Sequence, residues 1–421
     1  MTNFKLLLGA GTAALSLAVA DAAAADDQQA PAATPPAPTP PPYPAMGATL
    51  SNNAGSASFD AGPLGKITVN GDISGLAYTQ TNPGFDLDGH MNKDEGIDFS
   101  NAMVTIQKSD GVFQFVVEGG LYSFPALGTS YTSATHSSSD LFGPVPIGYV
   151  KIAPSSSFSF EVGQLPTLIG AEAPFTFQNL DIERGLLWNQ EPLVSRGVQV
   201  NLSHGPLAAS FAWTDGYYTG EYTSLSGNIT YTFKNNDTLI FDGEGNLSGN
   251  FRTCSFGCLA PALGGTGGPL GLATPTGGQS QGQIYNLIFN HSSGKWAITP
   301  YAQYSYIPST NVGGLILPRA QSWGAALLAK YSFTPEISLA GRAEYIGSSG
   351  GAPSFAGNIL YGPGSSAWSL TITPTYQKGV FFARLEGSFT AIGAGTRGFE
   401  LGGLGTASSQ LRGLLEAGVV F

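Results

Sequence analysis

Apolar and polar residues alternate along most of the chain after residue 66. From Leu411 to Phe421, every second residue is apolar or glycine, and Arg412 and Glu416 fall on the opposite face. Alternation with a period of two is typical of a β-strand that has one apolar face. Sixteen segments of this kind are expected to be strands: 66–79, 97–107, 112–124, 146–154, 157–164, 196–204, 207–217, 224–234, 237–246, 282–291, 295–306, 320–332, 336–347, 367–377, 380–391 and 410–421.

The connections between these segments alternate between short and long. Gly205–Pro206 and Lys378–Gly379 are short, Pro125–Val145 and Leu247–Gln281 are long, and Tyr218–Thr223 is the exception among the long class. Tight turns on one side and long loops on the other are typical of a transmembrane antiparallel β-barrel. The predicted fold is therefore all-β, with about sixteen strands. The count would range from fourteen to eighteen if a long loop such as 247–281 hid a hairpin.

The composition supports a barrel between lipid and water. Charged residues make up 11% of the chain, against about 25% in an average protein, and 58 glycines accompany 25 phenylalanines and 17 tyrosines. A lipid-facing barrel needs this mixture, whereas a soluble protein would be poorly dispersed by so few charges. The net charge of −11 argues against nucleic acid as a partner, which requires a basic surface.

The first residues predict export. Lys5 precedes an apolar stretch, Leu6 to Ala20, that is too short to span a bilayer as a helix. Residues 1–20 are predicted to be a signal peptide, with an alternative cleavage site up to residue 25. Residues 21–65 contain a proline-rich run and are predicted to be an extended periplasmic segment, leaving 66–421 as the outer-membrane barrel.

Charged residues occupy one face of each predicted strand, and that face must be the lumen. A central cationic side chain facing lipid would cost ~2–4 kcal/mol. Two roles are open for these charges, an ion-paired lining that stiffens the wall or a transverse field that orders polar solutes. The predicted lumen residues are Asp72, Glu118, Glu161, Asp242, Glu244, Arg342, Glu344, Arg384, Glu386, Arg412 and Glu416.

The long connection from Leu165 to Ser195 is unusually charged and bulky for this chain. We expect it to fold into the lumen and set the constriction, with an exposed surface loop as the alternative. Its candidate constriction residues are Glu172, Asp181, Glu183, Arg184 and Glu191.

Other chemistry is weakly represented. Cys254 and Cys258 lie in a glycine-rich loop, where a local disulfide is the first expectation and free thiols or a metal site the alternatives. The four histidines fall in predicted loops or beside turns, away from any serine and acid arrangement. No enzyme activity and no cofactor are expected.

Residues 161–172 and 179–202 carry a family resemblance. Gly163-Gln164, Pro166, Gly170 and Glu172, followed by Ser195 and Gly197, resemble a pattern of the β-barrel porins of the OmpL-like group in Gram-negative bacteria. The resemblance implies passive diffusion of small hydrophilic solutes and a role for Glu172 in fixing the loop. The alternative is a structural or surface-display barrel with a narrow or closed lumen, whose extracellular loops bind a partner.

The same resemblance to outer-membrane barrels sets the expected surroundings. The terminal Phe421 resembles the residue read by the barrel-assembly machinery. Outer-membrane lipid and lipopolysaccharide are the expected neighbours, and a homotrimer is expected by analogy with general porins.

Overall fold

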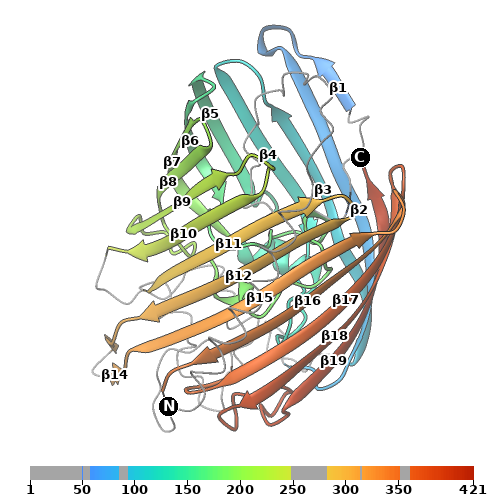
Figure 1. The fold of residues 1–421 in the computed structure, drawn as a ribbon, viewed down its shortest axis with the longest axis vertical. Helices are drawn as coiled ribbons and strands as arrows, with labels where there is room; N and C mark the ends of the chain where they lie inside the picture. The colour runs from blue at the N-terminus through green and yellow to red at the C-terminus, as the bar shows by residue number, and fades with distance from the viewer. Residues whose placement is uncertain (1–49, 51–56, 85–92, 248–281, 313–314, 351–360) are drawn as a thin grey trace. The chain divides into compact units, whose positions relative to one another are not determined.

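Alternating segments of this kind can satisfy every backbone hydrogen bond in lipid only by closing into a barrel. The computed structural model describes residue 50 and residues 57–84, 93–247, 282–312, 315–350 and 361–421. Sixteen antiparallel strands pair in chain order, and the last pairs with the first (Figure 1). They are β2 (Lys66–Gln80), β3 (Glu95–Lys108), β4 (Phe113–Tyr122), β5 (Ile147–Ser155), β6 (Phe158–Pro166), β7 (Val194–His204), β8 (Leu207–Thr214), β9 (Ser224–Thr232), β10 (Thr238–Asn246), β11 (Gln283–Ser293), β12 (Trp296–Ile307), β15 (Ala320–Ser332), β16 (Ile337–Ser348), β17 (Ser366–Lys378), β18 (Phe381–Ala394) and β19 (Ser409–Val420).

All sixteen predicted strands are present, which confirms the fold class. The end of β8 departs from the prediction because of a contact with a neighbouring strand. β8 ends at Thr214 because the next residue, Asp215, accepts the backbone N–H of Arg196 at 2.7 Å and its guanidinium Nη2 at 2.7 Å. Tyr218 then has a φ of 58°, which is incompatible with a strand.

The short turns lie on one side of the ring and use residues that tolerate a left-handed backbone. Gly205 and Gly294 both have a φ of 57°, and Asn236 has a φ of 67°. Such angles are strained for residues with a branched Cβ. The opposite side carries the longer connections, including residues 123–146 and 167–193. The alternation predicted from the sequence is therefore confirmed.

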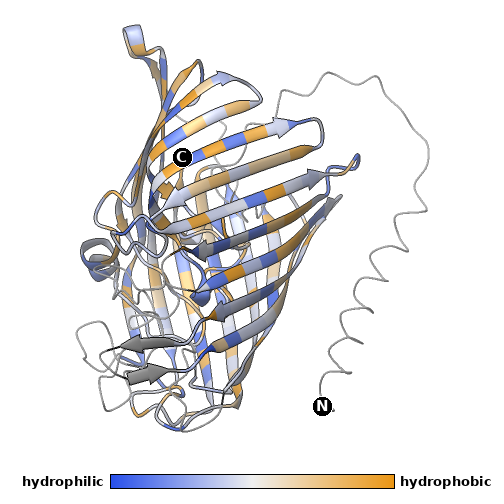
Figure 2. Ribbon diagram, turned by 90° about the vertical axis from the view of Figure 1, so that its left-hand side faces the viewer, coloured by the Kyte–Doolittle hydropathy of each residue, from blue (hydrophilic) through white to orange (hydrophobic). Residues whose placement is uncertain are grey.

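The two faces of the ring differ as the alternation requires. On β17, Leu370 and Ile372 are 57% and 52% exposed, whereas Thr371 and Thr373 are 2% and 0% exposed. Hydrophobic and hydrophilic residues alternate along the strands in Figure 2. The exposed apolar face suits lipid, where each buried Å² of apolar surface stabilises by about 25 cal/mol. The predicted charged residues consequently face the lumen.

The ring closes between β2 and β19, and Phe421 extends this closure. Its backbone N–H donates to the carbonyl of Gly71 at 2.9 Å, and the N–H of Gly71 donates back at 2.8 Å. A side chain at Gly71 would overlap the ring of Phe421. The terminal aromatic ring thus lies where only glycine leaves room for it.

We expect Gly71→Val to weaken the closure by about 1–3 kcal/mol, as overpacking does elsewhere. The measurement is the temperature at which the folded band converts to the unfolded band on a detergent gel. Gly387→Val is the matched control, because nothing lies within 4 Å of a Cβ built at that glycine. Equal shifts in both variants would contradict this account of Gly71.

Three features depart from the simple ring. β1 (Ala57–Asp60) pairs with the start of β2, because the turn Gly62–Leu64 reverses the chain within the predicted N-terminal segment. Leu50 is 4% exposed and packs against the inward-facing Phe382 and Val420. A hairpin does occur in a long loop, but it is formed by β13 (Thr310–Val312) and β14 (Leu315–Leu317), between β12 and β15, and stays outside the ring.

Several predictions fall outside the described residues. The predicted signal peptide, most of the proline-rich segment, and Cys254 and Cys258 all belong to this part of the chain. Within the described ranges, no helix has both the length and the apolar character to cross a membrane.

Candidate functional site

Residues 167–193, here called the inner loop, lie against the lumen side of the ring. Their charged side chains are almost entirely buried, with exposed fractions of 0% to 4%. The structure therefore places all five candidate constriction residues inside the barrel and not on its surface. They are Glu172, Asp181, Glu183, Arg184 and Glu191.

The inner loop contacts the inward-facing side chains of β16 to β19, here called the loop-binding wall. Arg342 on β16 lies at the centre of the first contact. Its Nη1 is 2.6 Å from Glu172 Oε1, its Nε is 3.2 Å from Glu344 Oε2, and its Nη1 also donates to the carbonyl of Glu183 at 2.7 Å. One arginine thus joins two carboxylates and the loop backbone.

Carboxylates of the wall also bind the loop backbone directly. Glu386 on β18 accepts the N–H of Ile182 at 2.5 Å and that of Glu183 at 2.9 Å. Glu344 on β16 accepts the N–H of Leu186 at 3.0 Å. Each such hydrogen bond contributes about 0.5–1.5 kcal/mol, and together these contacts fix the course of the loop.

The third contact involves β18 and β19. Arg384 and Glu416 face each other across these strands and form a buried ion pair. The Glu416 carboxylate accepts the hydroxyl of Thr176 in the inner loop at 2.6 Å, and Arg412 forms an ion pair with Glu183. The arginine and glutamate residues predicted as a wall lining therefore bind the loop, a role that we had not expected.

A second loop, residues 123–146, enters the lumen beside the inner loop. Arg184 donates its backbone N–H to the carbonyl of Pro125 at 3.0 Å, and its own carbonyl accepts the N–H of Leu127 at 2.9 Å. Its guanidinium carbon lies 5.8 Å from the ring centre of Phe124 and 5.5 Å from that of Trp188. This loop was not expected to enter the lumen, although its buried apolar residues Phe124, Tyr131, Leu141 and Phe142 are unusual for an exposed segment.

Three carboxylates near β10 have no cationic partner among the described residues. Glu191 accepts from the Tyr301 hydroxyl at 3.0 Å and the Gln303 amide at 2.8 Å. Asp242 accepts from Asn286 at 2.9 Å, and Glu244 accepts from Ser224 at 2.8 Å. Burial, followed by the nearby Asp242 carboxylate, raises the pKa of Glu191 well above its usual range.

The remaining predicted lumen residues are also buried. Glu161 forms an ion pair with Lys151 at 3.1 Å, and Asp72 accepts the hydroxyl of Ser74 at 2.6 Å. Glu118 on β4 is 3% exposed. Within the described chain, no three His, Cys, Asp or Glu side chains are arranged to hold a metal ion.

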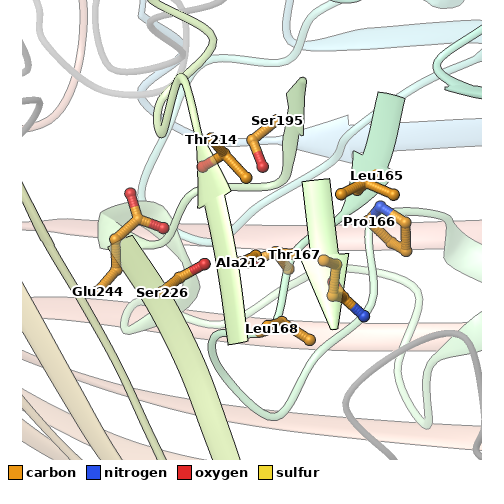
Figure 3. A pocket seen from close by; sticks show the side chains of 10 residues that line it. Leu165, Pro166, Thr167, Leu168, Ser195, Ala212, Thr214, Ser226 and Glu244 are labelled. Atoms are coloured by element: carbon orange, nitrogen blue, oxygen red, sulfur yellow. The ribbon is translucent and has the colours of Figure 1, made fainter. Parts of the chain in front are cut away.

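A cavity that is too tight to hold a water molecule lies between the start of the inner loop and the wall formed by β7 to β10 (Figure 3). We call it the side cavity. Hydroxyl, amide and carboxylate groups dominate the wall side, and apolar side chains dominate the loop side. The lining residues are Leu165, Pro166, Thr167, Leu168, Ser195, Gln199, Ala212, Thr214, Ser226 and Glu244.

A closed sixteen-strand ring with an apolar exterior, a charged interior and an inward-folded loop defines an integral outer-membrane channel protein. The family model described as "Putative beta-barrel porin-2, OmpL-like" matches residues 66–421, and the chain belongs to this family. The predicted family, location and function as a passive diffusion channel are thereby confirmed.

Solved structures show the same fold at low sequence identity. The outer membrane channel DcaP of Acinetobacter baumannii is 11% identical, with a TM-score of 0.52 over 84% of this chain and 97% of that one. OmpT of Vibrio cholerae in its trimer form is 10% identical, with a TM-score of 0.52 over 84% and 99%. OprB of Pseudomonas putida is 9% identical, with a TM-score of 0.50 over 84% and 94%. No curated protein matches the chain in sequence.

Proposed function

We propose that this porin is a narrow diffusion channel whose constriction is set by the inner loop. The observation that carries the proposal is the attachment of this loop to the loop-binding wall by Arg342, Glu344 and Glu386. An empty sixteen-strand barrel would enclose a wide aqueous channel. The attached loop reduces this width across the middle of the barrel.

The close packing of the inner loop supports small permeants. Its charged side chains are only 0% to 4% exposed, so little open space is left beside the wall that it binds. Large solutes would require the inner loop to move.

The test is the single-channel conductance of the purified full-length barrel in a planar lipid bilayer. We expect small, stable current steps in potassium chloride, and slower uptake of sugars than of ions in liposome swelling. A barrel that inserts but passes no current would overturn the proposal. It would instead support a structural or surface-display role for the extracellular loops.

We also propose a homotrimer and no catalytic role. The trimer form of the structurally similar OmpT supports the first of these. Two histidine contacts support the absence of a catalytic role. His136 pairs with Asp140 at 3.0 Å in a loop, and His291 pairs with Asp237 at 2.9 Å near a turn. Both pairs lie away from the lumen contacts. The mass of the detergent-solubilised protein, measured by light scattering, distinguishes monomer from trimer.

For export, we propose that residues 1–20 are a signal peptide, that 21–65 form the periplasmic segment, and that Phe421 is read by the barrel-assembly machinery. The apolar run from Leu6 to Ala20 supports the first role. The position of the Phe421 ring over Gly71 at the closing strands supports the last. Sequencing the N-terminus of the mature protein tests the cleavage site.

A further inference from the structure

We propose that the turn side of this barrel binds anionic phospholipid headgroups of the periplasmic leaflet through Lys234, Lys295 and Lys378. The proposal concerns the outer surface of the ring and goes beyond the channel function, because it does not depend on conduction. Three observations carry it: the placement of the lysines along the barrel, their pairing with acids, and the aromatic rings beside them.

Lysine is concentrated at the turn side of the ring. Of the lysines after residue 65, only Lys93 lies on the loop side. The described arginines, in contrast, lie in the lumen or on the loop side. The short turns of an outer-membrane barrel face the periplasm, so these lysines lie at the periplasmic leaflet. They are Lys66, Lys108, Lys151, Lys234, Lys295, Lys330 and Lys378.

Four of these lysines are not available to lipid. Lys108 forms an ion pair with Asp110, and Lys151 forms one with Glu161 at 3.1 Å. Lys66 and Lys330 belong to the inward-facing sets of their strands, together with the buried Asp72 and Leu328. Their charges are therefore neutralised by an acid or directed toward the lumen.

The other three lysines are exposed, and no carboxylate among the described residues pairs with them. Lys234 lies in the β9–β10 turn, Lys295 lies in the β11–β12 turn, and Lys378 is the last residue of β17. All three are on the half of the ring from β9 to β18. This arc of the turn side therefore offers free ammonium groups.

Lys295 shows how such an ammonium group is held at the membrane surface. Its Nζ donates to the carbonyl of Phe333 at 3.0 Å and lies 5.9 Å from the ring centre of Tyr331. The neighbouring Trp296 is 50% exposed, and its ring centre lies 4.7 Å from that of Tyr331. An ammonium group has three N–H donors, so two remain for a phosphate. Outward-facing Trp and Tyr rings collect at the lipid–water interface, which places Lys295 at headgroup depth.

Lys234 and Lys378 also lie beside exposed aromatic rings. Lys234 directly follows Phe233, which is 40% exposed. Lys378 pairs in register with Phe381 across the β17–β18 turn, and Phe381 is 66% exposed. The same combination of a lysine and an outward-facing ring thus occurs at three turns of one arc.

Acids are a minor component of this arc. In the described turns from β9 to β18 they are Asp237 and Glu336. Asp237 is engaged by His291, whose Nδ1 lies 2.9 Å away. Basic residues at a membrane surface attract anionic lipids within about a Debye length, so this surface favours phosphate groups.

The rings identify the membrane as the source of the anionic group. A phospholipid presents a phosphate and an acyl chain together, which matches a lysine beside an exposed aromatic ring. An anionic cell-wall polymer presents carboxylates without an apolar part, and would use the lysines alone. The observed combination therefore favours the lipid.

The first test is local and uses Trp296 as the reporter. Full-length protein is placed in phosphatidylcholine vesicles that contain equal fractions of brominated phosphatidylglycerol or brominated phosphatidylcholine. The fluorescence of Trp296 is obtained by difference from Trp296→Phe. We expect stronger quenching by the brominated phosphatidylglycerol. Lys295→Gln should lower its relative binding constant by up to about fivefold, the factor expected for one lysine at an anionic membrane surface.

Lys93→Gln is the matched control, because Lys93 is exposed on the loop side and its substitution removes the same charge. Equal quenching by the two brominated lipids in wild type would overturn the proposal. An equal loss in Lys93→Gln and Lys295→Gln would also overturn it, because the effect would then be one of total charge. A barrel that passes no current would overturn the channel function and leave this proposal standing.

The second test counts bound lipids by native mass spectrometry in an equal mixture of phosphatidylglycerol and phosphatidylcholine. Wild type should retain more phosphatidylglycerol, and the triple variant Lys234→Gln/Lys295→Gln/Lys378→Gln should retain the two lipids equally. An unchanged preference in the triple variant would overturn the proposal. Sedimentation with purified cell-wall sacculi tests the other source of negative charge. Binding to sacculi that the triple variant loses, without any lipid preference in wild type, would assign the lysines to the cell wall instead.

Discussion

Excising residues 168–192 and joining Thr167 to Leu193 by an Asn-Gly turn should raise the single-channel conductance several-fold. The two ends of the excised segment already lie together, since Pro166 pairs with Val194 and the N–H of Thr167 donates to Leu193 at 3.0 Å. A two-residue type I′ turn suits such a pair of strands. The ring should stay closed, because no ring strand lies within the excised segment.

The control for this experiment is a deletion in another loop. Removing residues 310–317, which include strands β13 and β14 that do not pair with the ring, should leave the conductance close to the wild-type value. An unchanged conductance after excision of the inner loop would mean that another segment sets the constriction. Residues 123–146 would then be the next segment to remove, because Pro125 and Leu127 bond to Arg184.

Arg342→Met should have the largest effect of any single substitution in the lumen. Arg342 is 1% exposed and joins Glu172, Glu344 and the backbone of Glu183. Removing one partner of a buried ion pair costs about 3–5 kcal/mol because the other charge is left uncompensated. We expect a loosened inner loop, seen as noisier and larger currents, and a lower temperature of unfolding in detergent.

A double-mutant cycle separates charge from packing. Arg342→Met leaves the buried Glu172 carboxylate without its cationic partner. Glu172→Gln removes this charge, so the double variant should recover part of the stability lost in Arg342→Met. Additive losses in the two single variants would contradict the pairing that we assign to Arg342. Arg342→Lys keeps the positive charge but loses the planar set of N–H donors of the guanidinium group. Its temperature of unfolding should lie between those of wild type and Arg342→Met.

The fold was predictable because its information is local. Along β17, the alternation of Leu370 and Ile372 with Thr371 and Thr373 specifies both the strand and its faces without reference to other segments. Turn residues such as Gly205 mark the short connections in the same local way. The ends of strands were less predictable, since β8 stops where Asp215 bonds to Arg196, a residue on another strand.

The site was predictable in its residues and not in its contacts. The charged residues of the inner loop and of the wall stood out because charge is scarce in this chain. Their partners are far apart in sequence, as with Glu386 and the N–H of Ile182, and no local pattern specifies such a pairing. Neutral partners such as Thr373 could not be distinguished in the sequence from the many other lumen hydroxyls. The Thr373 hydroxyl oxygen lies 2.7 Å from a carboxylate oxygen of Asp181 and 2.7 Å from one of Glu386.

Glu344 and Glu386 bind the inner loop through its main chain, at the N–H groups of Leu186, Ile182 and Glu183. Every amino acid except proline offers the same N–H group. The side chains of the inner loop, such as Thr167 and Leu168 beside the side cavity, can therefore be exchanged while the main-chain attachment to the barrel is retained. A library of loop sequences on an unchanged barrel would yield pores of graded size and charge.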